Sequence, residues 1–343
     1  MNTLIISDTS KLNQAASIIK NGGLVAVPTE TVYGLAANAL DGNAVSSIFR
    51  AKGRPNDNPL IVHIDSLDML YPLVKSIPPK AASLIKAFWP GPLTLIFESS
   101  DIVPCEVRAG LPTVAIRFPS HPVMCDLIKQ SGVPLAAPSA NTSGKPSPTN
   151  VARVIDDLSG KVDIIIDGGD CSVGLESSVV DTTSDIPTIL RPGGITEDML
   201  TEVIGEIKID PALINHDTNI KPISPGMKYT HYSPDAEVII VKGELDKVVA
   251  EINLKIEEAK IANKDVGILA TDETFALFDC EKILSVGSVS NLREIASNLF
   301  EVLRKFDDSH TDIVYSLAFP EIGIGKAIMN RLEKSAGYNI INK

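Results

Sequence analysis

The chain has 343 residues, a length typical of about two domains. Hydrophobic residues make up 44% and charged residues 22%, which excludes a disordered or collagen-like chain and predicts well-filled cores. The net charge is −12, and residues 1–208 and 209–343 each carry −6 of it. Neither part therefore has the positive excess of a dedicated nucleic-acid binder, although a local basic cleft stays compatible with these totals.

The sequence also indicates a cellular compartment. No apolar run approaches the ~18 residues that cross a bilayer, and the start MNTLIISDTSK is unlike a signal peptide. The four cysteines contain no Cys-x-x-Cys pair and the five histidines no His-x-x-x-His spacing, so we expect no disulfide framework and no protein-built metal site. We therefore predict a cytoplasmic protein without a membrane anchor.

The first domain is predicted to hold many short strands with helices between some of them. Helical periodicity, with apolar residues three and four apart, covers 9–21, 43–52, 79–88, 121–131 and 149–158. Short apolar runs predict strands at 24–29, 59–64, 93–98, 113–119, 134–139, 162–167, 177–183 and 187–192. Because strands outnumber helices and do not strictly alternate with them, we expect an α/β domain with a large, twisted, mixed sheet over residues 1–208.

A proline boundary separates this domain from the rest. Of 23 prolines, 22 lie at or before Pro234. Residues 209–235 show no period and are rich in Pro, Asn, Asp and Ser, so we predict a linker there. Its end, SPGMKYTHYSP, is rich in aromatic and basic groups, which indicates more than a passive tether.

The last domain, residues 236–343, is predicted to be a smaller α/β domain of Rossmann-like form. Strands at 237–243, 266–271, 282–288 and 312–318 alternate with helices at 246–263, 291–307 and 325–336. This βαβ pattern predicts a parallel sheet. No Gly-x-Gly-x-x-Gly follows a strand, and GIGKA (323–327) is too short for a phosphate loop, so no chemistry is placed here.

Two segments of the first domain have the composition of an anion site. In RAKGRPNDNPLIVH (50–63), Lys52 and Arg54 flank a glycine, which suits an oligophosphate, although a solvated helix C-terminus explains the same cations. In AAPSANTSGKPSPT (136–149), hydroxyls and amides follow a strand without any acid, which suits an anion, although an ordinary loop has the same composition.

Further polar groups stand beside apolar strands. PTETVYGLAANA (28–39) follows a strand and is either a ligand-binding turn or a turn with a buried tyrosine. Arg117 and Arg191 lie within apolar strands, where a buried cation needs a carboxylate or a ligand. GLESSVVD (174–181) adds a serine cluster before another strand.

These motifs together resemble the YrdC-like threonylcarbamoyl-AMP synthases of the long, two-domain form. The resemblance covers essentially the whole chain and rests on PTETVYGL, KGRPNDNPLIVH, FWPGPLT, APSANTSGKPSPT, GLESSVVD, LRPGG and SPGMKYTHYSP. Each motif alone is weak, whereas their combination in this order is highly specific.

The resemblance implies a nucleotidyltransferase that makes threonylcarbamoyl-AMP and pyrophosphate from L-threonine, bicarbonate and ATP with Mg²⁺. It also implies a partner, a tRNA-modifying threonylcarbamoyltransferase, while direct tRNA binding stays open. Such chemistry needs positioning and charge neutralisation more than a covalent nucleophile.

The resemblance further implies roles for individual residues. Lys52, Arg54, Ser139 and Asn141 would form the catalytic set. L-Threonine would contact Thr31, His63, Arg117, Ala137 and Ser177. ATP would contact Arg54, Asn58, Thr113, Ser139, Ser147 and Arg191. The linker would cover the nucleotide through His231 or Tyr232.

Two alternative functions remain open from the sequence. One is an ATP-dependent carbamoyltransferase that uses carbamoyl phosphate. The other is a non-catalytic RNA-binding module that uses the Lys52 and Arg54 cleft, a reading that the negative charge of the first domain weakens.

Overall fold

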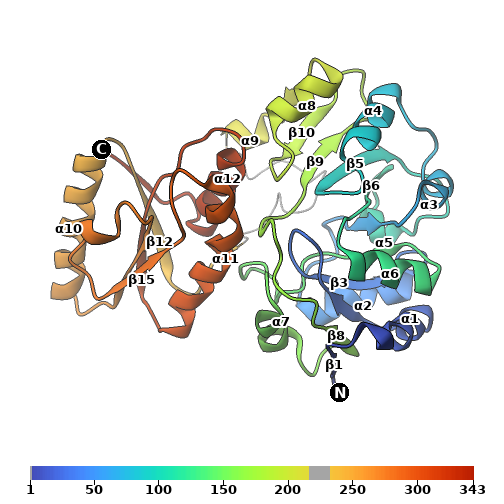
Figure 1. Cartoon of the computed structure of the whole chain (residues 1–343), viewed down its shortest axis with the longest axis horizontal. Coiled ribbons are helices and arrows are strands. Elements are labelled where there is room, and N and C mark those ends of the chain that lie inside the picture. The colour runs from blue at the N-terminus through green and yellow to red at the C-terminus, as the bar shows by residue number, and fades with distance from the viewer. Residues whose placement is uncertain (1, 216–231) are drawn as a thin grey trace. The chain divides into compact units, whose positions relative to one another are not determined.

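The computed structural model describes residues 2–215 and 232–343, which form two compact units (Figure 1). Residues 2–143 and 147–215 belong to the first unit, and residues 144–146 and 232–343 belong to the second. Within these ranges no helix combines the length and the hydrophobicity that a membrane span requires.

The described part of the first unit is built on one eleven-stranded sheet. Its strand order is β1-β8-β2-β3-β7-β4-β6-β5-β9-β10-β11, with parallel and antiparallel neighbours interspersed. The strands are β1 (Leu4–Ile6), β2 (Val25–Val27), β3 (Gly34–Asn38), β4 (Ile61–His63), β5 (Leu93–Glu98), β6 (Thr113–Arg117), β7 (Leu135–Ala136), β8 (Ile164–Ile166), β9 (Ser178–Asp181), β10 (Thr188–Arg191) and β11 (Lys208–Ile209). The mixed sheet predicted from the sequence is confirmed.

Helices pack against both faces of this sheet. They are α1 (Leu12–Lys20), α2 (Gly42–Lys52), α3 (Leu67–Leu70), α4 (Pro79–Phe88), α5 (Cys105–Arg108), α6 (Pro122–Ser131), α7 (Val151–Leu158), α8 (Glu197–Ile204) and α9 (Ala212–Asn215). Val25 and Val27 of β2 join the α1 and α6 side chains in one core, while Ala26 between them joins Ile48 of α2 in another. Successive residues of a strand face opposite sides, so a strand buried on both faces is apolar throughout.

Two features of the first unit differ from the sequence prediction. The segment 34–38 forms β3, which pairs with β2 and β7, although we read it as part of a turn. Its GLAAN sequence lacks the β-branched residues that mark a strand, and only its two neighbours supply the ladder. Regular structure also continues beyond the expected boundary at 208, because β11 pairs with β10 and α9 extends to Asn215.

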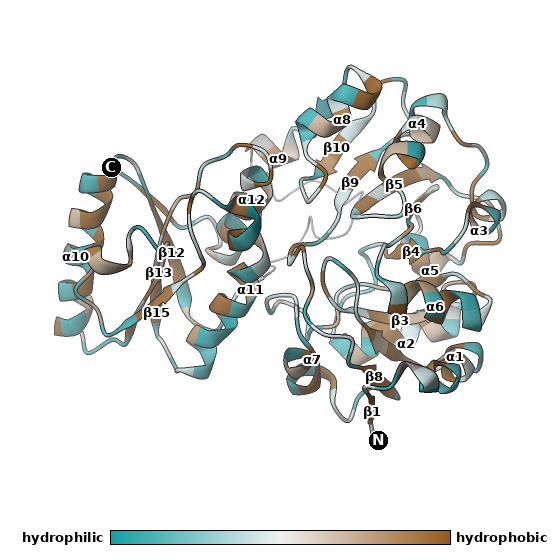
Figure 2. Cartoon of the chain, viewed as in Figure 1, coloured by the Kyte–Doolittle hydropathy of each residue, from teal (hydrophilic) through white to brown (hydrophobic). Residues whose placement is uncertain are grey.

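The second unit contains a parallel sheet, as its alternating pattern predicts. The strand order is β14-β13-β15-β12-β16, and every pairing is parallel. The strands are β12 (Glu237–Lys242), β13 (Val266–Ala270), β14 (Lys282–Ser285), β15 (Ile313–Leu317) and β16 (Ile340–Asn342), and the helices are α10 (Leu245–Ile261), α11 (Leu292–Asp308) and α12 (Gly325–Ser335). In both units the strands are mainly hydrophobic and the helices carry mixed faces (Figure 2).

Candidate active site

A row of buried polar side chains crosses the first sheet. In the ladder His63 of β4 is opposite Arg117 of β6, and Arg117 is opposite Thr94 of β5. Directly opposed residues project from the same face of a sheet, so these three side chains are neighbours. All three are buried. Polar groups in such a position need partners or a ligand.

The guanidinium of Arg117 is held from three sides. Its Nη2 lies 2.8 Å from Oε1 of Glu30, Nη1 donates a 2.8 Å hydrogen bond to the Thr31 hydroxyl, and Nε donates at 3.3 Å to the Gly91 carbonyl. The Thr29 hydroxyl lies 2.8 Å from that of Thr31. The turn after β2 thus fixes the arginine. This arrangement gives an oriented cation that suits a carboxylate.

The electrostatics of this cluster keep the histidines neutral. Burial, reinforced by the Arg117 cation, lowers the pKa of His63 to about 3. Burial also lowers the pKa of His121, the residue before α6. For Glu30, burial opposes ionisation, but the Arg117 cation prevails and lowers the carboxyl pKa. At neutral pH the cluster therefore combines a fixed ion pair with two uncharged imidazoles.

The row of buried polar side chains continues from Thr94 to Ser177 and Arg191. Oγ1 of Thr94 lies 2.7 Å from Oγ of Ser177. Arg191, the last residue of β10, donates to the Ser177 carbonyl through Nε at 3.0 Å and to the Ser177 hydroxyl through Nη2 at 3.2 Å. Ser177 precedes β9, which pairs with β5 and β10. The sheet therefore brings Arg117 and Arg191 into one row of buried polar side chains.

Lys52 organises the loop that follows β7. It is the last residue of α2, and its side chain is buried. Its ammonium donates to the carbonyl of Ser139 and, at 2.6 Å, to that of Asn141. The Ser139 hydroxyl in turn donates to Oδ1 of Asn141 at 2.5 Å. The Lys52 motif and the Ser139-x-Asn141 motif, far apart in sequence, therefore form one cluster.

Backbone pairing joins this loop to the Arg117 cluster. Ser139 forms an antiparallel bridge with Gly34, which lies three residues after Thr31. Leu35 N–H donates to the Pro138 carbonyl at 2.8 Å, and Ala137 N–H donates to the Ile61 carbonyl of β4 at 3.0 Å. The two polar clusters therefore draw on β3, β4, β6, α2 and the loop after β7.

The remaining predicted contacts lie at different distances from this centre. Arg54 donates through Nη2 to the Asn58 carbonyl at 3.4 Å, and the Ser147 hydroxyl donates to Glu176 at 2.5 Å. The side-chain amide of Asn58 is buried without a hydrogen-bond partner among the described residues. Buried polar groups are normally hydrogen-bonded, so this amide is a candidate ligand-binding group. Thr113 begins β6, whose opposite end carries Arg117, so it stands about 13 Å along the strand from that residue.

Tyr232 has its place in the second unit. Its ring stacks on Phe300 with 5.2 Å between centroids, and the Arg331 guanidinium carbon lies 5.8 Å from the ring centroid. Tyr232 is the first described residue after the gap, while His231 lies outside the described residues. The nucleotide contact expected of His231 or Tyr232 therefore stays a prediction.

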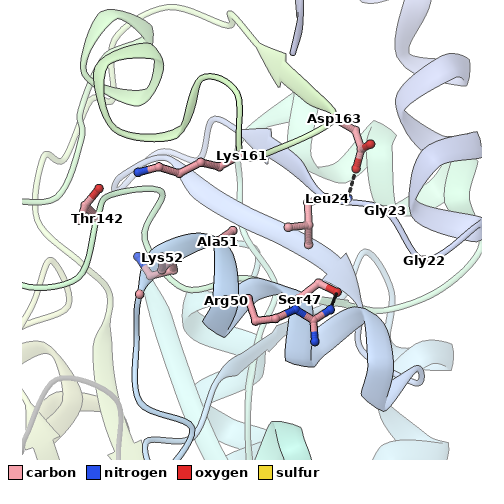
Figure 3. Close-up of a pocket in the computed structure, with 11 residues that line it drawn as sticks. Gly22, Gly23, Leu24, Ser47, Arg50, Ala51, Lys52, Thr142, Lys161 and Asp163 are labelled. Atoms are coloured by element: carbon pink, nitrogen blue, oxygen red, sulfur yellow. Dashed lines mark hydrogen bonds between the residues drawn. The ribbon is translucent and has the colours of Figure 1, made fainter. Parts of the chain in front are cut away.

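A cavity of about 680 Å³ borders the Lys52 cluster. It is lined by the C-terminal turn of α2, the glycine pair before β2, Thr142 and Lys161 (Figure 3). The side chain of Lys161 extends toward Thr142 in this view. The wall that Lys52 and Thr142 share places the cavity directly next to the Ser139-x-Asn141 loop.

Sequence reasoning assigned no individual role to four polar residues of these clusters: Glu30, Thr94, His121 and Glu176. Thr94 carried a signal, since it is a polar residue within the apolar run LTLIFE, as Arg117 is within TVAIR. Glu30 and Glu176 stood in motifs that we singled out, but pairing them with Arg117 and Ser147 requires the tertiary structure.

The fold and the site define a two-domain α/β protein with a buried cationic and hydroxyl-lined centre in its first domain. Two family models match the sequence: one described as "Telomere recombination" covers residues 17–193, and one described as "Threonylcarbamoyl-AMP synthase, C-terminal domain" covers residues 195–337. The chain belongs to the threonylcarbamoyl-AMP synthase family.

Individual relatives agree with this placement over nearly their whole length. A threonylcarbamoyl-AMP synthase of Pyrococcus abyssi is 48% identical over 331 residues, 96% of this chain and 95% of the relative. One of Bacillus subtilis is 47% identical over 332 residues, with coverage of 96% and 94%. The crystal structure of P. abyssi Sua5 complexed with L-threonine superposes with a TM-score of 0.94 at 47% identity, covering 99% of this chain and all of that one.

Proposed function

We propose that the protein is an L-threonylcarbamoyladenylate synthase, which makes threonylcarbamoyl-AMP and pyrophosphate from L-threonine, bicarbonate and ATP for threonylcarbamoyladenosine modification of tRNA. The observation that carries this proposal is the fixed Arg117 guanidinium beside Thr31 and His63, in a chain whose full-length relative binds L-threonine. A buried guanidinium whose N–H groups are held in fixed directions is suited to binding one planar anion, a carboxylate.

L-Threonine is assigned to the Arg117 cluster. The planar fork of Arg117 takes the substrate carboxylate, as an arginine fork matches two oxygens. Thr31, His63 and Ser177 supply polar contacts, and Ala137 supplies a small apolar wall. Because burial keeps His63 uncharged, it accepts or donates a hydrogen bond there without repelling the amine.

ATP is assigned to the residues around the Lys52 cluster. Arg54, Asn58, Ser139, Asn141, Ser147 and Arg191 supply cations, hydroxyls and amides, and Thr113 is the outermost member of this set. The orphaned amide of Asn58 supports a polar ligand at this place. Lys52 holds the loop by its carbonyls while it contributes positive charge.

The reaction follows from these positions. The neutral amine of threonine adds CO2, the dehydrated form of bicarbonate, and loses a proton to give a carbamate. A carbamate oxygen then attacks the α-phosphorus of ATP, and the bond to the leaving pyrophosphate breaks. The second step joins two anions, the carbamate and ATP, so alignment and charge neutralisation by Arg54, Lys52 and Arg191 lower its barrier. Exclusion of water protects the labile carbamate intermediate and the labile adenylate product.

Magnesium is proposed to enter with ATP. Within residues 2–215 and 232–343, no three His, Cys, Asp or Glu side chains are grouped as metal ligands. The donors around Lys52 and Asn141 are amides and hydroxyls, which suit the phosphates that bring the ion. Mg²⁺ in such sites neutralises phosphate charge and is held largely by phosphate oxygens and water.

The cellular setting belongs to the same proposal. We place the protein in the cytoplasm, where its product is passed to a tRNA-modifying threonylcarbamoyltransferase. The four cysteines, Cys105, Cys125, Cys171 and Cys280, are all free thiols, as in a reducing compartment. The lid role expected of linker 209–235 depends mainly on residues 216–231, which lie outside the described residues, and it stays a prediction.

Mass spectrometry of the products tests the function. The protein, incubated with ATP, Mg²⁺, L-threonine and bicarbonate, is expected to yield threonylcarbamoyl-AMP and pyrophosphate. An Arg54→Ala variant should fold and lose most of this activity. Pyrophosphate release with carbamoyl phosphate, but not with threonine and bicarbonate, would instead establish a carbamoyltransferase. Tight, salt-dependent RNA binding without ATP turnover would establish an RNA-binding module.

A further inference from the structure

Three residues of the proposed ATP loop are held by the second unit. Residues 144–146 belong to that unit, although the chain on both sides of them belongs to the first. They lie between Asn141 and Ser147, which are both assigned to ATP above. The C-terminal domain therefore holds a short piece of chain whose two ends lead directly into the proposed nucleotide site.

The second unit binds this piece by its backbone carbonyls. The N–H of Ser233 donates to the Gly144 carbonyl at 2.9 Å. Arg304 of α11 donates to the Pro146 carbonyl twice, from Nε at 3.0 Å and from Nη2 at 2.6 Å. The Arg304 side chain is buried, so these charge-assisted hydrogen bonds are poorly screened by water. Two donors from one rigid guanidinium fix the position of that single oxygen.

The flanks of the segment are fixed within the first unit. The N–H of Ser143 donates to the Lys52 carbonyl at 2.9 Å, and the Ser147 hydroxyl donates to Glu176 at 2.5 Å. Gly144 has a φ of +97°, a conformation that a side chain rarely allows, so the chain turns sharply there. With both flanks held, the orientation of the middle peptide groups depends on what binds their carbonyls.

Peptide planarity carries the effect of Arg304 to Ser147. The Pro146 carbonyl and the Ser147 N–H belong to one planar trans peptide group and point in opposite directions. A donor that fixes the carbonyl therefore also fixes the direction of the N–H. Backbone N–H groups of such loops are the usual donors to phosphate. The hold of Arg304 on Pro146 thus sets the direction of a donor next to the Ser147 hydroxyl.

We propose that Arg304 is a positioning residue for ATP: by holding the Pro146 carbonyl, it orients the backbone N–H of Ser147 toward the nucleotide. Arg304, a residue of the C-terminal domain, contributes to ATP use in this way through the loop that it holds. The proposal rests on the proposed function, because the assignment of Ser147 to ATP comes from it. The L-threonine cluster around Arg117 does not depend on this hold.

Steady-state kinetics of two Arg304 variants and one control test the proposal. Arg304→Met removes both donors and should lower kcat/KM for ATP by about 10- to 100-fold, the size of a small misplacement of a binding group. The KM for ATP should rise, while L-threonine binding, measured by calorimetry, stays at the wild-type value. Arg304→Lys keeps a charged donor and should recover part of the loss. Arg293→Met replaces an exposed arginine of the same helix and should match the wild type.

Hydrogen exchange keeps the test decisive if Arg304→Met fails to fold. In a folded Arg304→Lys protein, the peptide covering residues 142–150 should exchange faster than in the wild type. Wild-type exchange there together with a wild-type KM for ATP overturns the proposal. Equal loss of ATP and threonine binding in folded Arg304→Met also overturns it, because it indicates a general structural role. A wild-type protein that makes no threonylcarbamoyl-AMP refutes the proposed function, while the exchange measurement still reports on Arg304.

Discussion

The candidate site consists mainly of single buried polar residues, and neighbouring side chains fix the position of each one. Arg117 illustrates this: its position inside an apolar strand predicted an anionic partner, and the structure supplies both Glu30 at 2.8 Å and the Thr31 hydroxyl. Glu30, Thr31 and Gly91 use only some of the guanidinium N–H groups, so further N–H groups remain for the L-threonine carboxylate that we propose to bind here. His63 beside it gives a measurable consequence at the scale of one residue.

The buried state of His63 should appear as acid sensitivity. The folded protein lowers the pKa of His63 from 6.5 to about 3 through burial and the Arg117 cation. Between these values the unfolded chain binds a proton that the folded protein does not, so stability falls as pH drops below about 6.5. At pH 5 this group should lower the free energy of unfolding by about 2 kcal/mol relative to pH 7.5.

Urea unfolding at the two pH values measures this contribution. The loss of stability between pH 7.5 and pH 5 should be smaller in His63→Gln than in the wild type, by about 2 kcal/mol. His310→Gln, which replaces an exposed histidine, should lose as much as the wild type. An equal loss in His63→Gln and wild type would show that His63 is protonated as easily in the folded protein as in the unfolded chain.

At the scale of elements, the site depends on how closely two strands approach. A side chain on Gly193, two residues after β10, would place its Cβ 2.3 Å from the Ser178 backbone nitrogen and 2.8 Å from the Glu176 carbonyl oxygen. Glycine therefore lets the end of β10 press against the start of β9. This approach puts Arg191 within hydrogen-bond reach of Ser177.

Gly193→Ala should disturb both stability and the site. The backbone of residues 176–178 cannot move aside without shifting Ser177, so we expect a loss of about 1–3 kcal/mol in unfolding free energy, typical of overpacking. The KM values for L-threonine and for ATP should both rise. Gly194→Ala is the matched control, since its Cβ would approach only side-chain carbons, at 3.3 Å. Equal effects of the two substitutions would argue against the close approach as the cause.

At the scale of the whole molecule, the two units have different tasks in the proposed reaction. The residues assigned to L-threonine all belong to the first unit, while the 144–146 segment of the ATP loop belongs to the second. The first unit also extends past residue 208, through β11 and α9, where Leu213 packs against the main core. We therefore expect that the choice between an end at residue 208 and one at residue 215 affects stability, while loss of the second unit affects ATP use.

Truncation tests this division. A chain ending at residue 215 should be more stable than one ending at 208, by about 1–2 kcal/mol, because it keeps β11 and the partly buried Leu213. Both truncated chains should bind L-threonine, measured by calorimetry, and use ATP poorly, measured by its KM. A chain 1–215 with the wild-type KM for ATP would reduce the second domain to an accessory.

Local pattern determined the type of most elements, the mixed sheet of the first domain and the parallel sheet of the second. It also singled out Lys52, Arg117 and Arg191, because hydrophobic periodicity and polar interruptions are properties of short segments. Only the tertiary structure decided that Lys52 clamps the Ser139 loop, that Glu30 pairs with Arg117, that 34–38 is a strand and that Arg304 holds Pro146. These contacts join residues far apart along the chain, and their partners become neighbours only when the sheets assemble.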